Sequence, residues 1–450
     1  MGAEMTPGDN GHQDMVRRSG LAIVMVLAWL IGWPASSAAQ TAPAATVQSG
    51  DYQADYDNLP QFGGPDGVAP QLEQQDRKAE SAYPSAFLQR SLKPWFDWKR
   101  ELNEKHGFTL GASLYLLYQK ADQTIGSKDD ALGSIFRLQG KWTLFDRGGS
   151  HPGGIEWRIE NRSNLGGKLS PSQLGGEVGA AALNTGFAYA HDFSTDLAVF
   201  NWTQLFADER AGVAAGRLSF DVYLDAFAFQ TFSRGFLNRA FLVNPTLATT
   251  GIGSLGAVGK GFLSEQVWVG AHIYDANAVS GEFDINTVEE GEWLKALEVA
   301  WTPARARAKT DRVQFTFWDK DARQKAGVPA GQGWAVSASW QVTEALLPFV
   351  RFGHSDGGGG VVAKNAASIG FELATRPWQA WTFGAGWAEP TGTAANGRAK
   401  RDEYVLETSY KFQLSPNFSL LPDLQLLIDP ANQPSESTVL IGGLRGILTL

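Results

Sequence analysis

The stretch from Arg401 to Leu450 constrains the fold more than any other part of the chain. Apolar and polar residues alternate there in three successive runs, near 404–414, 418–428 and 438–450. A period of two is the signature of a β-strand whose two faces meet different surroundings. The sequence therefore ends in three consecutive strands, and the final strand has an apolar face.

An apolar terminal strand favours a closed barrel over an open sheet. A soluble protein rarely leaves an apolar edge strand uncovered, because its unpaired backbone groups invite aggregation. In lipid the closure is obligatory, since each backbone polar group must be paired within the protein. A soluble β-sandwich is the alternative, and it fits less well because the same alternation fills most of the chain.

The alternation recurs from residue 108 onward, with no helical pattern between the strands. Such a row predicts an all-β transmembrane antiparallel β-barrel of about sixteen strands, give or take two. Besides the three terminal runs, the expected strands lie near residues 108–119, 132–145, 154–163, 185–193, 197–206, 211–220, 262–274, 292–302, 312–319, 332–342, 345–354, 366–374 and 380–387.

One connection breaks the expected order of short periplasmic turns and longer outer loops. The segment from Asp221 to Gly261 is long, yet the strand count places it on the periplasmic side. The preceding link, Ala207 to Arg210, is too short for an outer loop. Either an extra hairpin lies in the long segment or one strand is wrongly assigned.

Three stretches resemble one protein family. The run from Pro422 to Pro434 is similar to the near-terminal strand and loop of the carbohydrate-selective outer-membrane porins, the OprB family. Trp98 to Phe108 resembles the family's entry into the first strand, and Asp284 to Pro303 is similar to a further part of it. The resemblance covers about residues 95–450. It implies passive diffusion of small, glucose-like sugars into the periplasm without a cofactor.

The N-terminal region predicts export. A pair of arginines precedes an apolar run from Leu21 to Trp33, and small residues follow it. This order is typical of a cleaved signal peptide, which we place at residues 1–39. The run is short for a membrane-spanning helix, which is the alternative. The expected location is the outer membrane of a Gram-negative cell, reached by the secretory pathway, with translation starting at Met1 or Met15.

The next segment, residues 40–92, is rich in Gln, Ala, Pro, Gly and Asp and shows no sustained period. We expect a flexible periplasmic leader there, although its scattered aromatic residues could dock on the barrel or the cell wall. From Pro94 onward, Trp98 and Leu102 at helical spacing predict a short periplasmic helix. The barrel domain is expected over residues 93–450.

Composition excludes several classes of function. The chain has no cysteine, so a disulfide framework, a thiolate metal site and a cysteine nucleophile are excluded. Its net charge of −9 argues against nucleic acid as a partner. The 16 Trp, 26 Phe and 10 Tyr would supply aromatic girdles at both membrane interfaces.

Charged residues alternate with apolar ones in the second and third expected strands. An arginine at the bilayer midplane costs about 2–4 kcal/mol, so these side chains should face a wet lumen. Opposed charges across a pore favour dipolar solutes rich in hydroxyl groups and moderate the selectivity for ions. A salt-bridge network that only stiffens the wall is the alternative. The residues are Arg137, Lys141, Glu156, Arg158, Glu160 and Arg162.

The segment from Gly216 to Gly261 is the best candidate for the pore constriction. Arginines alternate there with phenylalanines, and sugars offer apolar faces that stack on rings and hydroxyl groups that bond to charged side chains. The segment also resembles the region that narrows the pore in the OprB family; phenylalanines that merely pack on the wall are the alternative. The expected lining residues are Arg217, Asp221, Arg234 and Arg239, with Trp268 on the next strand beside His272 and Tyr274 unless that face meets lipid.

Other functions stay open. A general or anion-preferring porin would use the same barrel, although Glu156 and Glu160 interrupt the basic row. A barrel-anchored enzyme or adhesin would need a catalytic constellation or a folded insertion, and no histidine lies beside a persuasive nucleophile. We expect no metal site and no phosphate-binding loop. The expected partners are small sugars, outer-membrane lipids and the barrel-assembly machinery, contacted through the C-terminal strand, in a monomer or a homotrimer.

Overall fold

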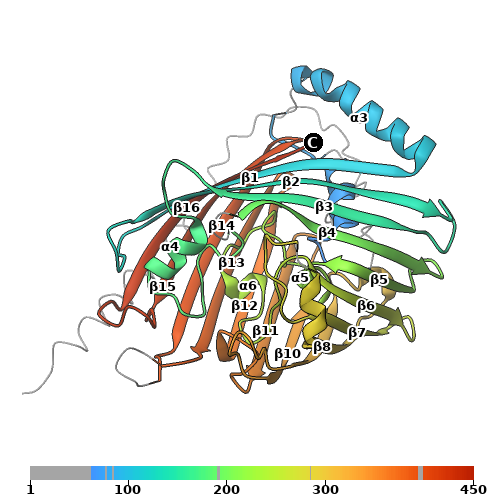
Figure 1. The fold of residues 1–450 in the computed structure, drawn as a ribbon. Helices are drawn as coiled ribbons and strands as arrows, with labels where there is room; N and C mark the ends of the chain where they lie inside the picture. Colours follow the sequence, from blue (N-terminus) through green and yellow to red (C-terminus); the bar gives the residue numbers. More distant parts are fainter. Residues whose placement is uncertain (1–61, 77–78, 84–85, 190–192, 284, 394–398) are drawn as a thin grey trace, which may run out of the picture. The chain divides into compact units, whose positions relative to one another are not determined.

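A computed structural model describes residues 62–76, 79–83, 86–189, 193–283, 285–393 and 399–450. Sixteen antiparallel strands close into one barrel, in which each strand pairs with the next along the chain and β1 pairs with β16 (Figure 1). The strands are β1 (Phe108–Ala121), β2 (Asp130–Phe145), β3 (Gly153–Asn164), β4 (Phe193–Phe206), β5 (Ala211–Leu218), β6 (Ser254–Phe262), β7 (Val267–Asp275), β8 (Trp293–Trp301), β9 (Arg312–Lys320), β10 (Gly331–Ser339), β11 (Leu346–Ser355), β12 (Ala363–Arg376), β13 (Gln379–Pro390), β14 (Glu403–Ser415), β15 (Phe418–Ile428) and β16 (Thr438–Thr449).

The predicted all-β barrel is therefore confirmed, but two errors in the expected strand list cancel each other. No strand spans residues 185–193, of which 190–192 lie outside the described residues; the chain turns at 184–189, where the Gly186 amide bonds to the Asn184 side chain. The expected list lacks β6, because its glycines at 256, 259 and 261 hide the alternation. The expected count of about sixteen is therefore confirmed, although one expected strand is absent and β6 was not expected.

Adding β6 restores the order of the connections. Turns such as 207–210, 377–378 and 416–417 lie at one end of the barrel, while longer loops such as 219–253, 321–330 and 429–437 lie at the other. The connection of residues 219–253 leaves from the long-loop end, so its expected periplasmic position is wrong. In the short 207–210 turn, Ala207, Asp208 and Glu209 adopt positive φ angles of 51°, 55° and 62°.

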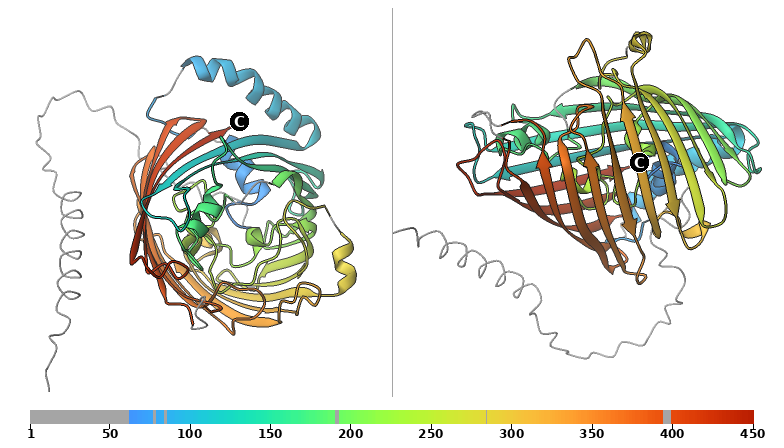
Figure 2. Two further views of the ribbon diagram at one scale, coloured as in Figure 1. Left: turned by 60° about the vertical axis from the view of Figure 1, so that its left-hand side comes forward. Right: turned by 90° about the horizontal axis from the view of Figure 1, so that it is seen from below.

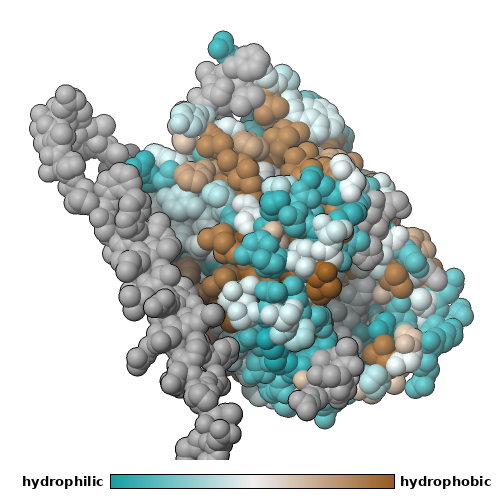
Figure 3. Space-filling model, turned by 90° about the vertical axis from the view of Figure 1, so that its left-hand side faces the viewer, coloured by the Kyte–Doolittle hydropathy of each residue, from teal (hydrophilic) through white to brown (hydrophobic). Residues whose placement is uncertain are grey.

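The two faces of the strands divide as the alternation predicts. Large apolar side chains such as Phe136, Leu297 and Phe315 are exposed on the outside, while Arg137, Glu298 and Gln314 beside them are buried inside. Hydrophobic residues gather in patches on the face of the barrel in Figure 3. Trp301 and Trp340 stack with ring centroids 6.0 Å apart at the short-turn end, as in an aromatic girdle. This inverted distribution, apolar outside and polar inside, is that of a barrel in lipid.

A charge on the outer face should be tolerated only near a rim. Leu297 lies at the middle of β8 and is 62% exposed, so Leu297→Arg is expected to lower the free energy of unfolding by about 2–4 kcal/mol. Urea unfolding in lipid vesicles, followed by tryptophan fluorescence, measures the change. Leu263→Arg, in the short turn before β7, is the matched control and should cost far less. Equal losses for the two variants would contradict a membrane-facing wall.

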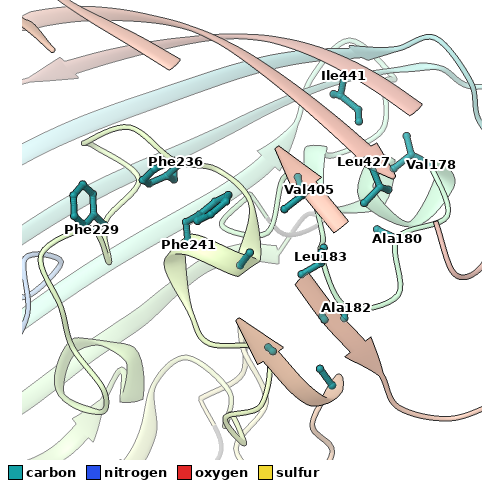
Figure 4. Packing of buried hydrophobic residues seen from close by; sticks show 14 of the residues in the cluster. Val178, Ala180, Ala182, Leu183, Phe229, Phe236, Phe241, Val405, Leu427 and Ile441 are labelled. Atoms are coloured by element: carbon teal, nitrogen blue, oxygen red, sulfur yellow. The ribbon is translucent and has the colours of Figure 1, made fainter. Parts of the chain in front are cut away.

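Two long loops fill the interior of the barrel. The first, described over residues 165–189, contains α4 (Pro171–Glu177), which begins with a capping box between Ser170 and Gln173. The second, residues 219–253, contains α5 (Phe220–Tyr223) and α6 (Arg239–Leu242). The view along the barrel shows both loops inside the wall (Figure 2). Their shared core contains Val178, Ala180, Ala182, Leu183, Phe229, Phe236, Phe241 and the wall residues Val405, Leu427 and Ile441 (Figure 4).

The helix expected from Pro94 is present and begins earlier. It is α3 (Ala86–His106), with Pro94 inside it, and it runs along β1 outside the barrel (Figure 1). The Trp142 ring nitrogen donates to the carbonyl of His106, the last residue of α3. Two one-turn helices, η1 (Asn286–Glu290) and η2 (Arg305–Arg307), lie in connections between strands. Among the described residues, no helix is both long and apolar enough to cross a membrane.

A second N-terminal helix, α2 (Val68–Asp76), lies inside the barrel, where it contacts β1, β2 and β3 (Figure 2). Val68 and Leu72 are each only 2% exposed and pack against Val199 of the wall. These residues belong to the segment expected to be a flexible leader. In the structure they are helical and buried.

Candidate pore-lining site

The strongest charge cluster lies on the inner face of β2 and β3. Arg137 and Glu160 face each other in the register of the two strands, and Arg137 Nε donates to Glu160 at 2.6 Å. Arg162 Nε donates to the other oxygen of Glu160, also at 2.6 Å. Arg158 Nε donates to Gln139 at 2.8 Å. The alternation thus places all of these predicted residues on one inner surface.

Two further carboxylate oxygens reach this cluster from outside the strands. Asp66, which precedes α2, accepts a hydrogen bond from Arg137 Nη1 at 2.9 Å and lies 3.7 Å from Arg158 Nη1. Aromatic rings cover the other side, since the Arg137 guanidinium lies 4.5 Å from the ring centroid of Phe232 and 5.7 Å from that of Tyr115. Three arginines therefore share two carboxylates in a buried site lined by aromatic rings. Charge–charge interactions are strong there because little water screens them.

Lys141 and Glu156 lie opposite each other, one pleat closer to the short-turn end. Glu156 is buried and Lys141 is half-buried. Both line a small cavity together with Val222 and Tyr223 of the second loop. They continue the row of opposed charges on the inner face of β2 and β3.

The predicted residues of the constriction segment do not form a single cluster. Arg217, on β5, donates to both oxygens of Asp196 at 3.0 Å and to the carbonyl of Leu197. Asp221 accepts from the Ser219 hydroxyl, and burial together with the negative charge of Asp66 raises the pKa of Asp221 above its ordinary value. Arg217 lies near the end of β5 and Asp221 lies near the start of the second loop. Their contacts hold the chain where the loop leaves the strand.

Arg234 and Arg239 lie farther along the same loop. Arg234 makes a two-pronged ion pair with Glu372 of β12, at 2.6 and 2.8 Å, and covers the ring of Phe229 at 4.5 Å. Arg239, in α6, lies 4.6 Å above the ring of Phe187, and its Nε has no hydrogen-bond partner among the described residues. Burial lowers the pKa of Arg239 to about 10, so its guanidinium remains charged at neutral pH. Arg234 is thus held in an ion pair with the wall, whereas Arg239 lies against an aromatic ring.

Trp268 faces the interior rather than lipid, and so do His272 and Tyr274 on the same strand. The Lys260 ammonium lies 4.9 Å from the Trp268 ring centroid. Trp268, Lys260 and Arg312 line a cavity near the short-turn end of the barrel. The expectation that this face extends the lumen lining is consistent with that position.

Several buried charged residues were not among the predicted lining residues, although most of them lie in the alternating pattern of the strands. Glu298, Arg351, Glu407 and Arg445 lie at inward positions of their strands. Their loop partners could not be found in this way. Glu407, for example, accepts from the amides of residues 237 and 238, far away in the sequence. No sequence pattern marked Asp66, because residues 40–92 show no regular alternation of apolar and polar residues.

Most of these inward charges hold the loops. Glu403 accepts from the amides of Ala181, Ala182 and Leu183 in the first loop. Arg445 donates to the carbonyls of Phe232 and Gly235 in the second loop. The wall thus fixes two loops that narrow a charged lumen, which is the arrangement of a selective channel.

A family model for the carbohydrate-selective porins, OprB family, matches residues 172–450, which is more than half of the chain. The chain belongs to the OprB family. It is an outer-membrane porin for carbohydrates, and its family and fold are those of channels rather than enzymes. A comparison with curated protein sequences gives no match.

Three solved structures were compared with this fold. The OprB of Pseudomonas putida in its high-pH structure is 16% identical, with a TM-score of 0.65 over 79% of this chain and 97% of that one. Its low-pH structure is 15% identical, with a TM-score of 0.45 over 83% and 100%. A triple mutant of the Rhodopseudomonas blastica porin is 11% identical, with a TM-score of 0.47 over 76% and 100%. The first of these supports the barrel fold of this OprB family member; the lower scores carry no argument.

Proposed function

We propose that this OprB family porin selects small, glucose-like sugars by hydrogen bonding in the lumen, without an energy source. The observation that carries the proposal is the inner surface of β2 and β3, where Arg137, Arg158 and Arg162 are fixed beside carboxylates and aromatic rings. Fixed guanidinium groups offer several donors to hydroxyl groups, and rings cover the apolar faces of a sugar. Opposed charges keep the site from becoming a simple anion trap.

The solute-binding residues we propose are Arg158, at the centre of the charge cluster, and Arg239, a half-buried arginine whose guanidinium lies over the ring of Phe187. The Asp66 carboxylate lies 3.7 Å from Arg158 Nη1, which is too far for a hydrogen bond. Weak binding at successive sites lets a solute enter and still leave. Residues such as Arg217 and Arg234, whose carboxylate partners are close, act instead by holding the loop.

Liposome swelling with refolded protein tests this selectivity. We expect glucose to enter faster than a neutral amino acid of similar size and faster than a disaccharide. A hydrogen bond from a charged donor contributes about 1.5–3 kcal/mol, so Arg158→Ala or Arg239→Ala should lower the glucose preference by roughly tenfold. Arg376→Ala, on an exposed residue near a short turn, is the matched control.

The pattern of rates separates the alternatives. Entry in order of size alone, unchanged by the substitutions, would mean a general porin whose arginines only build the wall. Faster entry of anions than of sugars would mean an anion-preferring pore. An absence of swelling with every solute would contradict channel function.

We also propose that residues 1–39 are a signal peptide that is removed on export through the secretory pathway. The barrel would then be inserted by the barrel-assembly machinery, which recognises β16. Mass spectrometry of the mature protein tests the cleavage after Ala39, and cross-linking in membranes distinguishes a monomer from a homotrimer.

A further inference from the structure

A segment that precedes the barrel in sequence is built into its lumen. This lumen segment, residues 62–76, comprises an extended stretch and α2, and nearly all of it is buried. It contacts the inner face of β1, β2 and β3 (Figure 2). A chain segment in this position occupies space through which solutes would otherwise pass.

Asp66 connects the lumen segment to the charge cluster of the wall. The residue is 6% exposed, and its carboxylate bonds to Arg137 Nη1 at 2.9 Å. Its backbone carbonyl accepts from Arg158 Nη2 at 2.6 Å. Gln71, one turn into α2, donates to the same carboxylate at 3.0 Å. Asp66 is therefore a counterion that neither strand of the cluster supplies.

Both ends of the lumen segment are fixed to other elements. The Phe62 ring lies 5.4 Å from that of Tyr223, and the Gly64 amide donates to the carbonyl of Val222 at 2.6 Å. At the other end, Asp76 pairs with Lys99 of α3 at 2.7 Å. The segment thus connects the second loop (residues 219–253, called the constriction loop below) to α3 outside the barrel.

The wall itself is shaped to receive the lumen segment. A Cβ atom on Gly111 of β1 would lie 1.9 Å from Gln75 Oε1, and one on Gly212 of β5 would lie 2.5 Å from Phe62 Cδ2. Glycine in a strand interior weakens the strand and often marks a close approach of another group. Two strands therefore lack side chains where the segment needs room.

We propose that residues 62–76 form part of the selectivity filter, with Asp66 as the residue that sets its charge and the segment as a whole setting its width. The proposal rests on the channel function above but concerns ion permeation, which can be measured without any sugar. With Asp66 in place, the three arginines of the cluster share two carboxylates. Without it they would share Glu160 alone, so the excess of positive charge would be larger.

Single-channel recording in planar bilayers tests the charge. Under a salt gradient, Asp66→Asn should raise the anion-to-cation permeability ratio by about twofold or more. The control is Glu80→Gln, which removes an exposed carboxylate just outside residues 62–76 and should leave the ratio unchanged. Equal ratios for wild type and Asp66→Asn would overturn the proposal. Loss of sugar preference alone, with unchanged ion selectivity, would also count against it.

Deletion of residues 62–76 tests the width. The conductance is expected to rise by about twofold or more, since the segment no longer occupies the lumen. Unchanged conductance in a folded deletion variant would overturn the proposal. Heat-modifiable migration on a gel shows whether the barrel of the variant has folded.

A cysteine pair tests the position of the lumen segment without a deletion. The chain has no cysteine, and a Cβ atom on Gly64 would lie 2.9 Å from Cβ of Ala226 in the constriction loop. A disulfide needs about 3.5–4.5 Å between these atoms, so only a small shift is required. Gly64→Cys with Ala226→Cys should cross-link under mild oxidation with wild-type conductance, while Gly64→Cys alone should not. Failure to cross-link, or a conductance that collapses on cross-linking, would overturn a fixed segment in the lumen.

Discussion

Replacing Glu298 with glutamine is expected to lower the free energy of unfolding by about 3–5 kcal/mol, the usual cost of breaking a buried ion pair from one side. Glu298, on β8, is 4% exposed and pairs with Lys260 at 2.8 Å. It also accepts from the Asp225 amide, which fixes the constriction loop, and from His272 Nε2 at 3.0 Å. The substitution leaves the Lys260 ammonium buried without its counterion. Urea unfolding in lipid vesicles measures the loss.

A double substitution separates the charge from the packing. Lys260→Met with Glu298→Gln removes both charges at similar volume, and it should be more stable than Glu298→Gln alone. Glu265→Gln, which breaks the exposed pair with Arg210 in a short turn, should change stability little. If the double variant were as unstable as the single one, the loss would come from the loop contacts rather than from the ion pair.

The β2 and β3 cluster shows how much of the site the sequence could predict. A period of two assigns each residue to one face, and a charged residue every second position cannot face lipid, so Arg137, Glu160 and Arg162 were placed correctly. The same rule fails for β6, because glycine has no side chain to mark a face. Periodicity therefore identifies the wall wherever side chains alternate.

The interior depended on contacts that no local pattern contains. The sequence marked residues 216–261 as a constriction, but it did not show which distant strand holds a given arginine of that segment. Arg234, for instance, was predicted to line the constriction, but its ion pair with Glu372 of β12 has no signal in the local sequence. The lumen segment was missed for the same reason, since Asp66 acquires its role only when the closed barrel brings Arg137 and Arg158 around it.

Inward-facing acidic and basic side chains bind different backbone groups of the interior loops. Carboxylates of β14 and β8 accept from loop amides, as Glu403 and Glu298 do, while arginines such as Arg445 donate to loop carbonyls. Each loop therefore satisfies its backbone groups on the wall rather than in regular structure, which buried backbone groups require. Charged side chains on the inner face of the wall therefore help to hold the interior loops in their folded positions.

Glu407→Gln is expected to release the inner part of the constriction loop and to widen the channel. Glu407 is 1% exposed, and its two oxygens accept from the amides of Leu237 at 2.5 Å and Asn238 at 3.0 Å. A glutamine of the same size has one acceptor and one donor in place of two acceptors, so one buried amide loses its partner. That loss costs about 1–3 kcal/mol, which is enough to shift a loop that is held by a few such contacts.

The expected result in planar bilayers is a conductance about twofold higher, with frequent transitions between levels, because a released loop samples more than one position. Arg445→Met removes the donors to Phe232 and Gly235 in the same part of the loop and should act in the same direction. Glu389→Gln, at the far end of β13, where Glu389 bonds to Asn365, is the matched control and should conduct like wild type. Wild-type conductance in both Glu407→Gln and Arg445→Met would show that the phenylalanine core of the loop, rather than the charged wall, holds the constriction in place.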